Sequence, residues 1–114
     1  MRFILTALIL TFATQVAAGY INDRNEWNKT AKDKSFQAAY AMGAFDQITQ
    51  KYHGAKKGRC VWIKKINKCA LEMKFTGPDL ADLINSHYQD LENWRHSANV
   101  ALQEGLVKVC KTKK

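Results

Sequence analysis

Hydrophobic residues recur at helical spacing in the middle of the chain. In residues 35–50 the apolar positions run at four-residue steps, as on a helix with one buried face: Phe36, Tyr40, Ala44 and Ile48, with Ala41 and Phe45 beside them. Ser35 is suitably placed to cap the start of this helix. Gly43 lies near its middle, where glycine costs about 1 kcal/mol relative to alanine. We therefore expect another backbone or ring to cross closely at Gly43.

A second helix has the clearest start signal in the sequence. Thr76 suits the N-cap, Pro78 the first turn and Asp79 the third helical position. The apolar stripe that follows consists of Leu80, Leu83, Ile84, His87 or Tyr88, and Leu91. After a break at residues 92–96, Ser97 can cap a last helix. Its apolar residues are Ala98, Ala101, Leu102, Gly105 or Leu106, and Val109.

The remaining segments are less regular. Residues 20–34 are polar apart from a few side chains, and we expect an irregular lead-in with one helical turn around Trp27. Residues 51–59 contain two glycines and predict a loop. The period of residues 60–74 does not distinguish a helix from an extended piece. Because no stretch alternates convincingly, the sequence predicts one all-α domain, a small bundle of three to four helices.

The N-terminus has the organisation of a secretory signal peptide. Arg2 precedes an uncharged apolar run over residues 3–13, and Val16 and Ala18 suit the small residues before a cleavage site. The run is too short to cross a hydrocarbon core of about 30 Å as a helix. We therefore expect residues 1–18 to be a cleaved signal peptide and residues 19–114 to form the exported domain, with no stable membrane insertion.

The charge balance indicates the kind of partner. The chain carries a net charge of +8, and loss of residues 1–18 removes Arg2 and no acid, so the exported domain carries +7. This excess favours an acidic protein or an anionic envelope component. Export makes nucleic acid the least expected partner.

Much of the positive charge is concentrated in one segment. Residues 51–74 contain eight cations and one acid, with aromatic residues interleaved. Such a surface can pair with carboxylates while a tryptophan acts as a desolvated anchor. It can equally be a solvated face with the tryptophan packed inward. The residues that we assign to partner binding are Tyr52, Lys56, Lys57, Arg59, Trp62, Lys64, Lys65 and Lys68.

The cysteines and histidines do not predict a chemical centre. Three cysteines in an exported domain indicate one disulfide and one free thiol, with three pairings open. No C-x-x-C or H-x-x-x-H pair is present, so we expect no metal, no redox dithiol and no other cofactor. His53 lies near Cys60, but no oriented base or oxyanion turn accompanies them. We expect His87 to be a boundary residue and His96 to be solvated, and we predict a binding protein and no enzyme.

Several short motifs resemble a known family. The segment Tyr40-Ala41-Met42-Gly43-Ala44-Phe45-Asp46 is similar to the helix motif Tyr-Ile-x-Gly-Val-x-Asp of the type VI secretion amidase immunity proteins, the Tai/Rap group. That family places a cysteine before a helix that opens in a Gly-x-Leu pattern, and ends an alanine-rich last helix at another cysteine. The corresponding residues here are Cys69, Gly77 with Leu80, Ala101-Leu102 and Cys110.

This resemblance, which covers about residues 36–110, implies a periplasmic immunity protein. Such a protein would bind a cognate peptidoglycan amidase and block its active-site cleft, without turnover and without a cofactor. The resemblance also implies a helical bundle that can form a homodimer, with Tyr40, Gly43 and Asp46 as fold residues. The alternative is a basic periplasmic binding or chaperone-like protein that acts on anionic envelope components.

Three positions depart from the family pattern. Gln37 stands where the family has a cysteine, Leu71 stands where it commonly has a proline, and Cys60 has no counterpart. Because the first-helix cysteine is absent, the resemblance favours a disulfide between Cys69 and Cys110. A Cys60–Cys69 disulfide is the alternative.

Overall fold

The computed structural model describes residues 20–53 and 61–112. The predicted signal peptide lies outside these residues. The elements are α2 (Arg24–Asn28), α3 (Lys34–His53), α4 (Val61–Glu72), α5 (Gly77–His87), the short 3-10 helix η1 (Leu91–Asn93) and α6 (Ala98–Val109). The described part of the chain contains no strand, so the all-α prediction is confirmed. Its smallest α-helix, α2, is the single turn expected around Trp27.

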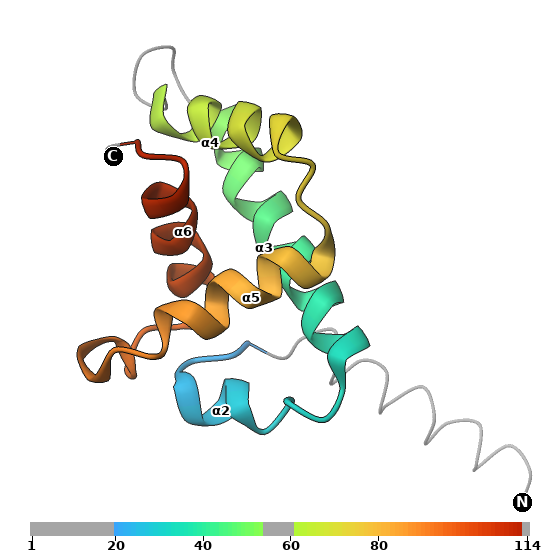
Figure 1. Ribbon diagram of the computed structural model, residues 1–114, viewed down its shortest axis with the longest axis vertical. Coiled ribbons are helices and arrows are strands. Elements are labelled where there is room, and N and C mark those ends of the chain that lie inside the picture. The colour runs from blue at the N-terminus through green and yellow to red at the C-terminus, as the bar shows by residue number, and fades with distance from the viewer. Residues whose placement is uncertain (1–19, 54–60, 113–114) are drawn as a thin grey trace, which may run out of the picture.

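The other helices are arranged around α3, which is the longest (Figure 1). α4 packs near the C-terminal end of α3, and α5 crosses the N-terminal half of α3. α6 lies beside α5 and also contacts α3 and α4. The core is therefore enclosed between α3 and the pair formed by α5 and α6.

Small side chains on α3 allow this close packing. Ala41, Ala44 and Ile48 form its buried face, at the three- and four-residue steps that the sequence predicts. The buried residues that meet them in the core are Ile21, Trp27, Ile66, Leu80, Ala81, Ile84, Tyr88, Ala98, Ala101, Leu102 and Leu106.

Two helix starts have the predicted caps. At α5, the Thr76 N–H donates to Asp79 Oδ2 at 2.9 Å, and Thr76 Oγ1 accepts from the Asp79 N–H at 3.4 Å. The backbone N–H of Thr76, followed by its hydroxyl, lowers the pKa of Asp79. At α6, Ser97 Oγ accepts from the Val100 N–H at 3.2 Å. The reciprocal pair at α5 and the single serine cap at α6 stabilise the starts of these two helices.

The predicted cap of α3 is wrong. The helix begins at Lys34, one residue before Ser35. Asp33 Oδ1 accepts from the Phe36 N–H at 2.9 Å and so satisfies a donor of the first turn. Asp33 is therefore the capping side chain. Ser35 already lies inside the helix, so its side chain does not occupy the N-cap position.

The expectation that another element crosses at Gly43 is also wrong. A Cβ added at Gly43 would meet nothing within 4 Å. The close crossings occur at two other glycines. A Cβ at Gly77 would lie 3.1 Å from Ala38 Cβ, where α5 crosses α3, and a Cβ at Gly105 would lie 3.2 Å from Leu83 Cβ, where α6 meets α5.

Of the three motif residues expected to support the fold, only Tyr40 has visible packing contacts. Its hydroxyl donates to Asn99 Oδ1 and accepts from the Ile21 N–H at 3.4 Å, and burial raises its pKa. Asp46 is exposed, as is Gly43. The tyrosine of the motif thus joins α3 to α6 and to the lead-in segment.

The open surroundings of Gly43 predict that Gly43→Ala stabilises the protein. The substitution should raise the free energy of unfolding by about 0.5–1 kcal/mol, because alanine loses less backbone entropy in a helix and meets no neighbour here. Urea denaturation followed by circular dichroism measures the change. Gly105→Ala is the matched comparison and should destabilise, because its Cβ would press on Leu83. Equal effects at the two glycines would contradict this account.

Candidate partner-binding surface

α4 divides its side chains between the core and the solvent. Ile63, Ile66 and Ala70 are buried at three- and four-residue steps, so the ambiguous segment is an amphipathic helix. The opposite side of α4 is exposed and is named here the α4 face. It consists of Val61, Lys64, Lys65, Lys68, Leu71 and Glu72, so three lysines share this side with one acid.

The α4 face combines positive charge with open apolar surface. Val61 is 50% exposed and Leu71 is 70% exposed, and the three lysines lie between them along the helix. Lysine stems add apolar contact while the ammonium groups reach carboxylates. This combination suits a partner surface on which acidic side chains surround an apolar patch.

The residues assigned to partner binding fall into three groups in the structure. Lys64, Lys65 and Lys68 lie together on the α4 face, as the assignment requires. Trp62 is half-buried and packs against the core, so the inward alternative describes it better than the role of a free anchor. The assigned residues whose side chains lie outside the described part are Tyr52, Lys56, Lys57 and Arg59. Of these, Tyr52 has its backbone in the last turn of α3.

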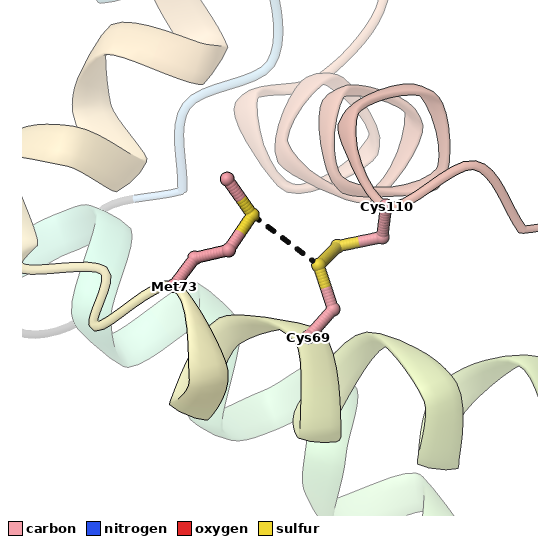
Figure 2. The surroundings of a disulfide bond; sticks show 3 residues. All are labelled: Cys69, Met73 and Cys110. Atoms are coloured by element: carbon pink, nitrogen blue, oxygen red, sulfur yellow. Dashed lines mark hydrogen bonds between the residues drawn. A yellow bond between two sulfur atoms is a disulfide. The ribbon is translucent and has the colours of Figure 1, made fainter.

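A disulfide joins α4 to the end of α6 (Figure 2). Cys69 of α4 is bonded to Cys110, the C-cap of α6, and their Cα atoms lie 5.9 Å apart. Met73 Sδ lies 3.7 Å from Cys69 Sγ. The pairing favoured by the resemblance is therefore confirmed. The bond holds the helix that carries the α4 face against the rest of the bundle.

Gln37 occupies a buried position where the resembled family has a cysteine. It is 2% exposed, and its Nε2 donates to Thr30 Oγ1 at 3.0 Å and to the Trp27 carbonyl at 3.4 Å. The side chain thus ties α3 to the turn that follows α2. Sequence reasoning marked this position as a departure but did not predict the hydrogen bonds.

The connection between α5 and α6, residues 88–97, exposes apolar side chains that the sequence did not assign to a surface. Leu91 is 70% exposed, so its prediction as part of the buried stripe is wrong. The reason is that α5 ends at His87 and the chain turns away into η1 before Leu91 can face the core. Trp94 is 40% exposed, with the guanidinium of Arg24 4.1 Å from its ring centroid.

Side-chain hydrogen bonds hold residues 88–97 in shape. The Tyr88 hydroxyl donates to the His96 carbonyl at 2.6 Å, and Trp94 Nε1 donates to the Tyr88 carbonyl at 3.0 Å. Asn93 Nδ2 donates to the His87 carbonyl at 2.9 Å. The segment is therefore a braced surface feature that projects from the bundle, as Figure 1 shows beyond the end of α5.

Two histidines meet at the base of this segment. His87 Nε2 lies 2.8 Å from His96 Nδ1, and the rings are stacked with centroids 5.1 Å apart. Burial, and then the neighbouring His96, lower the pKa of His87. The expectation of a boundary histidine fits His87, whereas His96 is half-buried and paired instead of simply solvated.

A groove of about 640 Å³ lies beside His87, between the end of α5 and α6. Leu83 and Val107 contribute apolar surface, and the rim carries charges of both signs from Asp90 and Lys108. A pocket with this composition can accept an apolar group flanked by polar contacts. The mixed charge of its rim does not select one ligand class.

Residues 20–53 and 61–112 contain no group of three or more histidine, cysteine, aspartate or glutamate side chains that could hold a metal ion. None of the helices in the described part of the chain is long and apolar enough to cross a membrane.

Comparison with known proteins gave no relative: no family, no curated protein and no solved structure matches this chain.

Proposed function

We propose that this chain is a periplasmic immunity protein that binds a peptidoglycan amidase delivered by type VI secretion and occludes its active-site cleft. The observation that carries the proposal is the Cys69–Cys110 disulfide. Three cysteines leave three pairings open, and the motif resemblance favours the one that joins α4 to α6. The helical bundle also agrees with what the resemblance implies.

Gln37 departs from the family pattern without conflicting with the proposal. A polar residue at a buried position needs hydrogen-bond partners to be compatible with a stable core. Gln37 provides hydrogen bonds to Thr30 and Trp27 from within the core. The departure from the family pattern is therefore compatible with a stable fold of the same kind.

Inhibition in this proposal is steric and electrostatic. The α4 face would lie on acidic and apolar groups around the partner's cleft, with the lysines steering the encounter and Val61 and Leu71 adding desolvated contact. Substrate exclusion would follow from coverage of the cleft. The protein would contribute no reacting group.

Charge reversal on the α4 face tests this proposal. The triple variant Lys64→Glu/Lys65→Glu/Lys68→Glu should bind the proposed amidase partner about 100-fold more weakly, because attraction becomes repulsion. Titration calorimetry and inhibition of peptidoglycan cleavage measure the effect. The matched control is Lys29→Glu/Lys32→Glu/Lys34→Glu, which changes the net charge equally at exposed positions before and at the start of α3.

If the two triple variants weaken binding to the amidase equally, the α4 face is not the contact surface. The immunity function itself would be excluded if the adjacent genes encode no cell-wall amidase and the protein neutralises none when the two are co-expressed in the periplasm.

A second candidate is a basic binding or chaperone-like protein for anionic envelope components, which the net charge of +8 and the lysines of the α4 face favour. Salt separates the two functions. Exposed charges more than about 10 Å apart are largely screened at 0.1 M salt. Binding to an anionic polymer should therefore fall steeply between low and moderate salt, whereas an interface that also buries Val61 and Leu71 should persist.

A further inference from the structure

His87 and His96 connect the last turn of α5 to the end of segment 88–97. With both rings neutral, one of the two facing nitrogens donates its proton and the other accepts, which satisfies their separation of 2.8 Å. A single added proton still leaves one acceptor. With both rings protonated, both facing nitrogens carry hydrogen, and two positive charges stand side by side. The contact between the rings cannot survive the second proton.

Charged groups from two elements face His87. Burial is the main influence that disfavours its protonated form, and His96 and Lys108 act in the same direction. Glu104 of α6 and Asp90 of the loop favour the protonated form but do not outweigh burial, so the pKa of His87 lies below its ordinary value of about 6.5. Protonation of His87 is therefore disfavoured at neutral pH, and it takes place as the pH falls through this lowered pKa.

We propose that the His87–His96 pair is a pH-sensitive clasp that, beside the hydrogen bond from the Tyr88 hydroxyl to the His96 carbonyl, tightens segment 88–97 near neutral pH and loosens it when both rings are protonated. The segment includes Leu91 and Trp94, so the clasp controls how rigidly these exposed side chains are presented. The proposed clasp depends only on the two rings and their neighbours, so it does not rest on the proposal that the partner is an amidase.

Hydrogen exchange on the whole protein tests the clasp. The amides of Asn93, Trp94 and His96 donate to carbonyls within the segment at 3.0–3.2 Å and report its closure. Their protection factors, measured by NMR and corrected for intrinsic exchange, should fall at least tenfold between pH 7.5 and pH 5.0. The amide of Leu106 in α6 should change less than twofold. Loop protection that is constant over this range overturns the proposal.

Two substitutions separate the clasp from a general effect of acid. His96→Asn can place an amide oxygen where Nδ1 accepts, and His87→Gln can place an amide nitrogen where Nε2 donates. An amide offers both a donor and an acceptor, so each replacement can pair with the remaining histidine in either protonation state, and loop protection in each variant should vary less than twofold with pH. His53→Asn, which alters the third histidine, should keep the tenfold fall.

The three variants decide between clear alternatives. A tenfold fall that persists in both His96→Asn and His87→Gln overturns the clasp. Loop protection that is already lost in these variants at pH 7.5, with Leu106 still protected, supports the clasp, because the ring contact then accounts for closure.

Discussion

Replacing both bonded cysteines, in Cys69→Ala/Cys110→Ala, should lower the free energy of unfolding by about 3–4 kcal/mol. The bond links residues 41 positions apart, and in the chain-entropy model a loop of this length restricts the unfolded chain by that amount. Because a domain of this size is stabilised by only about 5–15 kcal/mol, the loss is a large fraction of the total. The midpoint of thermal unfolding should fall by roughly 12–30 °C.

Urea denaturation without reductant, followed by circular dichroism, measures this loss. Addition of reductant to the unsubstituted protein should reproduce it. Cys60→Ala is the matched control and should change the unfolding free energy by less than about 0.5 kcal/mol, as expected for a residue outside the bond. If Cys60→Ala destabilises as strongly as the double variant, Cys60 is bonded and the alternative Cys60–Cys69 pairing applies.

Local signals in the sequence predicted those parts of the fold that depend on neighbouring residues. Thr76 with Asp79, and Ser97, cap their helices because a cap is an interaction over three residues. The end of α4 carried no such signal. Lys74 has a left-handed φ of 56° where glycine is usual, so the sequence offered nothing to mark the position.

Contacts between distant segments could not be predicted in this way. Gly43 and Gly105 both lie inside helical patterns. Only the contact between α5 and α6 shows that a side chain would be crowded at Gly105 and would be free of neighbours at Gly43. Leu91 continues the spacing of the α5 stripe, but the helix ends before it. The spacing of apolar residues predicts which side chains share a helix face only within the residues that are helical.

The candidate surface was predicted in part. Charge concentration identified Lys64, Lys65 and Lys68, because exposed lysines on one helix face follow from spacing and solvation. The direction of Trp62 did not follow, since a tryptophan beside lysines can face either way. The pair of His87 and His96 was missed because two residues nine positions apart meet only through the turn that η1 makes.

Trp27 should be the most costly single side chain to remove from the lead-in segment. Its side chain is completely buried, and its ring packs edge-on against Tyr40 with centroids 5.9 Å apart. Its Nε1 donates to Asn85 Oδ1 of α5 at 2.7 Å, 58 residues away in the chain. Trp27→Ala should therefore lower the free energy of unfolding by about 3–5 kcal/mol, from lost burial and the cavity that remains.

Trp94→Ala provides the comparison for a tryptophan at the surface. Trp94 contributes a contact with the Arg24 guanidinium and one hydrogen bond, so its removal should cost only about 1–2 kcal/mol. Urea denaturation followed by circular dichroism at 222 nm avoids dependence on tryptophan fluorescence. Equal losses at the two positions would show that the lead-in segment is not part of the cooperative core.

Trp27→Phe separates the two contributions at the buried site. Phenylalanine retains much of the apolar surface but cannot donate to Asn85 Oδ1, which would leave that oxygen without its partner from Trp27. The expected cost is about 1–3 kcal/mol. In the Asn85→Leu background the cost of Trp27→Phe should shrink, because no acceptor then remains to be satisfied. If Trp27→Phe lowers the free energy of unfolding equally in both backgrounds, Trp27 stabilises the protein through packing alone.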